Sequence, residues 1–168
     1  CLRAGVGLLT VQIPHLGYPV IQTAVPEAMA SVDQHDYTFT EFPDLSQFSA
    51  VGVGPGIGLK SNTKKALCEL LEKSQVPLVI DADALNILAE SKNWLEKLPE
   101  NSILTPHPGE FKRLVGESDN SYESVQKQIE FSIKYKVVVV LKGAFTSVST
   151  PHGMLFFNST GNPGMATA

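Results

Sequence analysis

The sequence has few cysteines, no run of basic residues and no long apolar segment, and each of these absences excludes a class of protein. Two cysteines in 168 residues cannot form a disulfide framework, so we expect a reducing, cytoplasmic environment. Thirteen basic residues against seventeen acidic ones give a formal charge of −4, which argues against a nucleic-acid partner or an anionic membrane surface. The best apolar stretch, residues 137–141, has the length of a strand and not the ~18 residues of a membrane helix.

The low charge is accompanied by enough apolar residues to build a core. Hydrophobic residues make up 43% of the chain and charged residues 18%. A chain of this length buries roughly 70% of the surface that its unfolded form exposes. We therefore expect a single domain over residues 1–168 and exclude a wholly disordered chain.

Short β-branched runs alternate along the chain with longer stretches of helical periodicity. Strands are expected at residues 6–13, 51–54, 78–80, 102–105 and 137–141, and helices at residues 60–74, 84–91 and 120–135. Residues 146–150 and 154–158 predict a β-hairpin, whereas the polar residues 33–42 are interpreted as a surface excursion. The repeated strand–helix order predicts an α/β fold with a mostly parallel central sheet flanked by helices.

Unusual loops follow the expected strands. They cover residues 52–58, 81–86, 105–110, 142–146 and 159–168. Ligands of open parallel sheets bind beyond the carboxyl ends of the strands, so these loops should meet at one edge and form a site there.

The first of these loops has glycine at every second position from 52 to 58, among them Gly54 and Gly56. Such a loop lets a phosphate or a ribose approach the backbone closely. Its spacing matches neither the dinucleotide fingerprint nor the Walker loop, and a tight strand-to-helix turn is the alternative.

The loop after strand 78–80 contains two aspartates. Asp81 and Asp83 could hold magnesium through water or orient a ligand hydroxyl. The alternative is that Asp83 caps the following helix while Asp81 bonds to a neighbouring loop.

The loop after strand 102–105 holds His107 between two prolines, which restrict its backbone on both sides. A histidine presented in this way suits ligand contact, and a simple helix-entry turn is the alternative. The other histidines, His15, His35 and His152, are interpreted as surface residues.

The last two loops suggest phosphate contacts. Lys142 follows the expected strand 137–141 and could meet a phosphate, with Gly143 leaving room for the backbone, although a lone lysine at a strand end is usually solvated. The small and polar residues 162–168 could form an anion site at a helix start.

In this order, the loops resemble the ADP/ATP-dependent NAD(P)H-hydrate dehydratase family, which is ribokinase-like and related to carbohydrate kinases. The resemblance rests on the segments RAGVGL (3–8), VGPG (53–56), DADALN (81–86), TPHPGEF (105–111), KGA (142–144) and NPGMAT (162–167). Each motif is modest by itself, but all of them in register along nearly the whole chain are specific.

The resemblance implies repair of hydrated NADH or NADPH at the expense of ADP or ATP, with Mg²⁺, in a homo-oligomer to which an epimerase domain can be fused. The hydrated dinucleotide would contact Gly54, Gly56, Asp81, Asn86 and His107, and Asp83 would face the metal. The adenine nucleotide would be bordered by Lys142, Gly143, Ala144, Phe145, Thr146, Asn162, Gly164, Met165, Ala166 and Thr167.

The resemblance also implies that the catalytic aspartate of the family follows Ala168, so that residues 1–168 would be an incomplete domain without activity of their own. Two other functions fit the same loops. One is a small-molecule kinase acting on a vitamin precursor or a sugar, and the other is a non-catalytic nucleotide-binding module.

Overall fold

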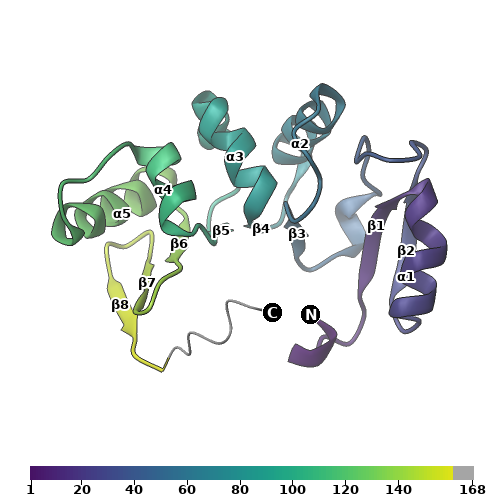
Figure 1. Cartoon of the computed structure of the whole chain (residues 1–168), viewed down its shortest axis with the longest axis horizontal. Helices are drawn as coiled ribbons and strands as arrows, with labels where there is room; N and C mark the ends of the chain where they lie inside the picture. Colours follow the sequence, from purple (N-terminus) through teal and green to yellow (C-terminus); the bar gives the residue numbers. More distant parts are fainter. Residues whose placement is uncertain (161–168) are drawn as a thin grey trace.

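The computed structural model describes residues 1–160 and contains two β-sheets (Figure 1). The larger sheet has six strands in the order β3 (Val51–Val53), β4 (Leu78–Ile80), β5 (Ile103–Leu104), β6 (Val138–Leu141), β7 (Thr146–Ser149) and β8 (Leu155–Asn158). The strands β3 to β6 are parallel, and β7 and β8 add an antiparallel hairpin. This confirms the expected mostly parallel sheet, the hairpin and the interior position of the strand after residue 137.

Helices cover one face of this sheet (Figure 1). They are α2 (Ser61–Lys73), α3 (Ala82–Glu90), α4 (Pro108–Val115) and α5 (Ser121–Tyr135). In β4, Leu78 and Ile80 are fully buried, whereas Val79 points to the other face and is 39% exposed. The apolar stripe of α2, which includes Leu67 and Leu70, packs into the same core. The core therefore lies between the sheet and this helical layer.

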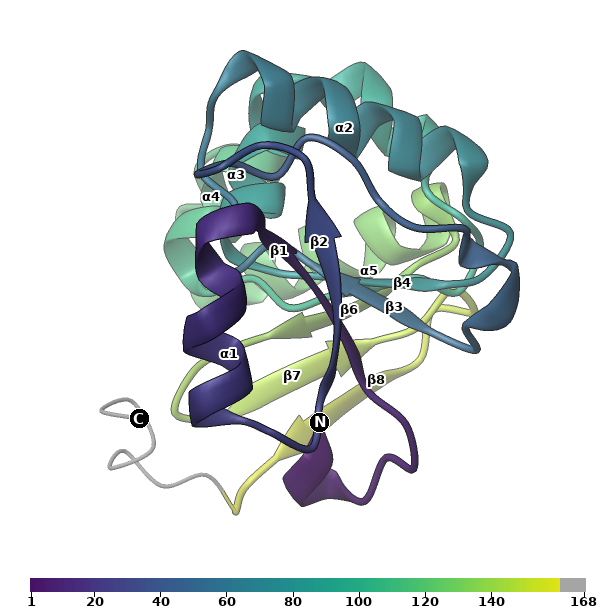
Figure 2. The same cartoon turned by 90° about the vertical axis from the view of Figure 1, so that its right-hand side faces the viewer.

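The smaller sheet pairs β1 (Thr10–Pro14) with β2 (Met29–Asp33) in parallel, and α1 (Tyr18–Ala24) connects them. Figure 2 shows this unit in front of the larger sheet. The strand expected at residues 6–13 begins only at Thr10, because the pairing with β2 starts there, opposite Met29. Short 3-10 helices complete the described chain at Leu2–Ala4, His15–Gly17, Leu45–Gln47 and Lys92–Lys97.

Two further expectations are corrected. The helix α3 begins at Ala82, so its N-cap is Asp81 and not Asp83. The segment 33–42 is only partly a surface excursion, because Asp33 is 1% exposed. Its carboxylate accepts hydrogen bonds from the backbone amides of His35, Thr40 and Glu41, so it holds the loop that follows it.

No helix within residues 1–160 is long and apolar enough to cross a membrane.

Candidate functional site

The carboxyl ends of β3, β4, β5 and β6 meet at one edge of the sheet. Backbone hydrogen bonds join the residues that follow them: Asp81 N donates to Val53 O (3.1 Å), Thr105 N to Ile80 O (3.0 Å) and Lys142 N to Pro106 O (2.9 Å). The parallel register brings four of the five predicted loops together, as expected for a site at the carboxyl edge, whereas most of the fifth, residues 159–168, lies outside the described residues.

The two glycines assigned to ligand contact differ in their surroundings. Gly54 has a φ of +137°, and a Cβ at this position would lie 1.7 Å from the carbonyl oxygen of Asp81. The backbone that approaches Gly54 closely is therefore that of the neighbouring strand end. Gly56 has a φ of +70° and nothing within 4 Å of a built Cβ, so its exposed backbone is open to a ligand.

An ion pair links two of the predicted loops. Lys142 Nζ donates to Asp81 Oδ1 at 2.7 Å, and both side chains are partly exposed. Burial raises the pKa of the Asp81 carboxyl, but hydrogen bonds from Lys142 and from the Ala82 amide outweigh it, so the pKa lies below its usual value. Asp81 is thus a carboxylate at neutral pH, and Lys142 is held at the edge of the sheet, not freely solvated.

The second aspartate bonds to the glycine loop. Asp83 Oδ2 accepts a hydrogen bond from the Gly58 amide at 2.9 Å. The sequence alternative assigned a helix cap to Asp83, which is wrong because the N-cap position is Asp81. It also assigned a loop contact to Asp81, and the bond between Asp81 and Lys142 confirms that contact. Between the two aspartates, Ala82 has a φ of +49°, a conformation that is strained for a residue with a side chain. Asp83 as a metal ligand stays a prediction.

His107 is the N-cap of α4, and its ring is fixed by hydrogen bonds. Its Nδ1 accepts from the Gly109 amide at 3.0 Å, and the buried Glu110 carboxylate accepts from the His107 amide at 2.8 Å. Because Nδ1 is an acceptor, the proton of the neutral ring is on Nε2, which lies 3.4 Å from Glu110 Oε1. The side chain is nevertheless 52% exposed. The helix-entry turn is therefore real, and it presents an oriented ring to solvent.

The loop 142–146 is open at its tip. Gly143, Ala144 and Phe145 are exposed, and Thr146 Oγ1 closes the turn by donating to Gly143 O at 3.2 Å. The predicted nucleotide contacts Asn162, Gly164, Met165, Ala166 and Thr167 lie outside the described residues.

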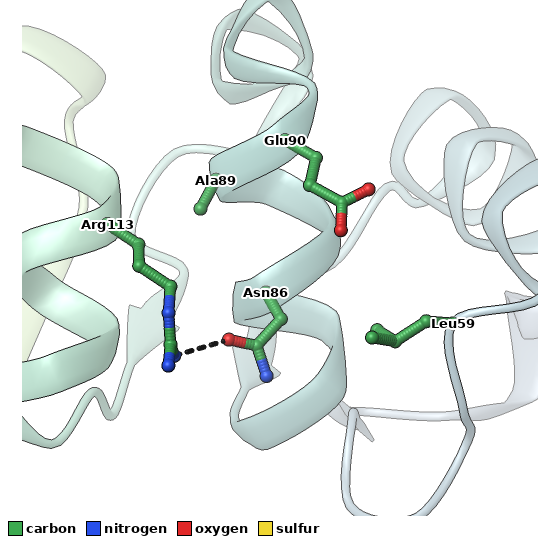
Figure 3. Close-up of a pocket in the computed structure, with 5 residues that line it drawn as sticks. All are labelled: Leu59, Asn86, Ala89, Glu90 and Arg113. Carbon is green, nitrogen blue, oxygen red and sulfur yellow. Dashed lines mark hydrogen bonds between the residues drawn. The ribbon is translucent and has the colours of Figure 1, made fainter.

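A depression of about 500 Å³ lies beside these loops (Figure 3), lined by Leu59, Asn86, Ala89, Glu90 and Arg113. Asn86 was expected on the ligand side, whereas Arg113 was not considered. Arg113 Nη1 donates to Asn86 Oδ1 at 2.8 Å and so connects α4 with α3. The sequence offers one signal for Arg113, its position six residues after His107 on the helix that His107 caps.

Comparison with known proteins gives consistent matches. Residues 1–168 match the family described as NAD(P)H-hydrate dehydratase. A bifunctional NAD(P)H-hydrate repair enzyme, Nnr, of Moorella thermoacetica is 36% identical over 99% of this chain, which spans only 33% of that relative.

Solved structures show the same fold. An ADP/ATP-dependent NAD(P)H-hydrate dehydratase from Bacillus subtilis, crystallised with ATP/Mg²⁺ and soaked with CoA, has a TM-score of 0.77 at 27% identity and covers 98% of this chain and 59% of its own. A ribokinase-like protein from Enterococcus faecalis has a TM-score of 0.79 at 27% identity, covering 100% of this chain and 58% of its own. These likenesses confirm the expected ribokinase-like fold.

Proposed function

The chain belongs to the NAD(P)H-hydrate dehydratase family, and from this premise we propose that it contributes to an enzyme that returns hydrated NADH or NADPH to the intact dinucleotide with ADP or ATP as co-substrate. One observation supports the proposal above all. The exposed ring of His107, the Asp81–Lys142 pair and the open glycine loop all lie at the same edge of the sheet. The chain spans about a third of the bifunctional relative, so the activity belongs to the whole protein.

The chemistry explains why a kinase-like scaffold suits a dehydration. Hydroxide is a poor leaving group, so the hydroxyl on C6 of the hydrated ring gives its proton to a base, and its oxygen attacks the terminal phosphorus of the nucleotide. The nucleotide leaves with one phosphoryl group fewer. The ring nitrogen lone pair then expels inorganic phosphate from C6, and loss of the C5 proton restores the double bond. Such a reaction needs two nucleotides held face to face and donors directed at the transferring phosphoryl group.

We assign the two ligands to different parts of the edge. The hydrated dinucleotide would lie against the open backbone of Gly56 and the ring of His107, whose Nε2–H can donate to it. Lys142 would supply a positive charge to the phosphates of ADP or ATP, with residues 143–146 beside the adenine nucleotide. Gly54 would shape this site indirectly, because its Cα faces the Asp81 backbone.

Magnesium would enter with the nucleotide. Within residues 1–160 there is no group of three or more His, Cys, Asp or Glu side chains that could hold a metal ion. Asp81 is paired with Lys142, and Asp83 accepts from Gly58. Mg²⁺ commonly combines one or two carboxylates with substrate phosphates, so the described residues fit a nucleotide-borne ion better than a preformed cage.

Three broader expectations remain part of this proposal. Residues 1–168 would form a single ribokinase-like unit, the enzyme would assemble as a homo-oligomer, and an epimerase domain would belong to the same protein. The name of the bifunctional relative supports the last of these.

Variants of His107 test the proposal, with NADH regenerated from its hydrate followed by absorbance in the full-length protein. His107→Ala removes both the ring and the cap acceptor, which costs about 1 kcal/mol of stability. His107→Asn keeps a capping side chain and removes only the imidazole. We expect both variants to raise the KM for the hydrated dinucleotide about tenfold, and only the alanine variant to melt at a lower temperature.

The same assay can contradict the proposal. If both variants keep the KM of the wild type while His107→Ala lowers the melting temperature, His107 is a cap and nothing more. If a stable phosphorylated product accumulates and no NADH appears, the enzyme is a small-molecule kinase.

A further inference from the structure

The depression between α3, α4 and the segment before α2 is lined by one acidic and one basic side chain, Glu90 and Arg113, and within residues 1–160 only the acidic one has a charged partner. Glu90 pairs with Lys64, so its carboxylate is compensated. Arg113 forms no ion pair with any described residue of the chain, and its hydrogen bond is to the neutral amide of Asn86. An arginine beside a neutral amide, with free N–H groups directed at a cavity, is typical of a site for an anion.

The hydrogen bond also fixes the amide of Asn86. A guanidinium can only donate, so Oδ1 must face Arg113, and Nδ2 with its two protons points away from it, as Figure 3 shows. The remaining guanidinium N–H groups and the amide N–H groups therefore belong to two residues that both line the depression. Leu59 and Ala89 supply an apolar wall next to these donors.

This depression adjoins two parts of the chain that the proposed function assigns to the dinucleotide, the glycine loop and the helix capped by His107. Leu59 directly follows Gly58, whose amide is bonded to Asp83 on α3. The helix α4 that carries Arg113 is the one capped by His107. A dinucleotide whose nicotinamide ring meets His107 must place its phosphates some distance away, and a depression of about 500 Å³ is large enough for a phosphate and part of a nucleoside.

We propose that Asn86 and Arg113 bind a phosphate group of the hydrated dinucleotide. This inference rests on the proposed function and adds the subsite that would decide substrate preference. The phosphate could be part of the pyrophosphate, which both hydrates carry, or the 2′-phosphate, which only NADPH hydrate carries. The planar guanidinium with a neighbouring amide suits either, because both present several oxygens to a fork of donors.

Asn86→Asp is the sharpest test. The aspartate keeps an acceptor for Arg113 and forms an ion pair with it, so folding should be preserved, but it replaces the amide donors by negative charge. Arg113→Gln removes the cation, and Lys112→Gln is the matched control, since Lys112 lies on the same helix and pairs with Glu117 at 2.5 Å outside the depression. The full-length protein is assayed with NADH hydrate and NADPH hydrate separately.

We expect Asn86→Asp and Arg113→Gln to raise KM at least tenfold while kcat changes little, and Lys112→Gln to behave as the wild type. Equal losses for both hydrates identify the pyrophosphate, and a loss confined to NADPH hydrate identifies the 2′-phosphate. An unchanged KM for both hydrates in well-folded Asn86→Asp overturns the inference.

Direct binding separates this inference from the proposed function. Titration with NADH and NADPH, the products, needs no turnover, so it reports on the subsite even if the wild type converts neither hydrate. Weaker binding of NADPH, or of both dinucleotides, to Asn86→Asp supports the phosphate subsite. Equal binding to wild type and variant contradicts it, even in a protein that is an active dehydratase.

Discussion

Gly54→Ala should destabilise the protein far more than Gly56→Ala, although the two glycines are separated by one proline and were both predicted to contact ligand. The new Cβ at position 54 would lie 1.7 Å from the Asp81 carbonyl oxygen, whereas ordinary contacts begin near 3.4 Å. The strand ends of β3 and β4 must therefore separate. At position 56 the added methyl group meets only open space.

The cost at position 54 combines three effects. Separating the strand ends breaks the hydrogen bond from Asp81 N to Val53 O, which is worth about 1 kcal/mol. Overpacking of this kind costs about 1–3 kcal/mol, and the positive φ adds about 1–3 kcal/mol. We expect a total of about 3–7 kcal/mol, against about 1 kcal/mol for the left-handed alanine of Gly56→Ala.

Thermal and urea unfolding of the two variants and the wild type measure this difference. In a chain of this size each kcal/mol lowers the melting temperature by about 2–4 °C, so Gly54→Ala should melt roughly 6–28 °C lower and Gly56→Ala only a few degrees lower. Gly56→Ala should instead weaken binding of the hydrated dinucleotide. Equal destabilisation by the two substitutions would show that the Asp81 backbone does not determine the residue at position 54.

Two further predictions concern charge. Burial raises the pKa of the Asp33 carboxyl, but hydrogen bonds from Thr40, His35 and Glu41 outweigh it and the pKa is lowered. Its contribution to stability is therefore present above the unfolded-state pKa of about 3.9 and is lost as the pH falls below it through the folded-state pKa. Asp33→Asn should have a lower free energy of unfolding than the wild type at pH 7, and this difference should disappear below about pH 4. Urea unfolding at both pH values measures it. The same difference at both pH values would contradict the prediction. Lys142→Met should raise the KM for ADP or ATP about tenfold or more and change the KM for the hydrated dinucleotide less, because the lost charge acts on phosphates. Steady-state titration of each ligand measures the two KM values. An equal rise of both would contradict the assignment of the two ligands to different parts of the sheet edge.

The sequence predicted best the elements whose residues carry their own periodicity. The buried stripe of α2 and the five apolar residues before Lys142 were assigned correctly because a core helix and an interior strand each have a distinctive pattern. The extent of β1 was wrong, since an apolar run does not show where its partner strand begins. Segment 33–42 was misjudged because its polar composition indicated exposure, whereas Asp33 is buried by the backbone of its own loop.

The sequence suggested candidate residues in the segments that follow strands, Asn86 among them, and overlooked Arg113, which lies within a later helix. Strand ends attract attention because parallel topology brings them together, and this led to Asp81, His107 and Lys142. Arg113 lies inside α4, where a charged residue is usually interpreted as solvated. Only the three-dimensional contact with Asn86 shows that it faces the depression.

Asp81 lies between the glycine loop and the loop of Lys142, and the energies of its contacts indicate its role there. Its backbone packs on Gly54 and its carboxylate pairs with Lys142, so one residue joins the loop 52–58 to the loop 142–146. A partly exposed ion pair is worth no more than about 1 kcal/mol, whereas charge-assisted hydrogen bonds to phosphate are stronger. An incoming phosphate can therefore draw Lys142 into its own hydrogen bonds at small cost. Before phosphate binds, the ion pair restrains the side chain of Lys142, whose free rotamers represent about 2 kcal/mol of entropy. Asp81 is thus better understood as a residue that positions Lys142 for phosphate than as a competitor of that phosphate.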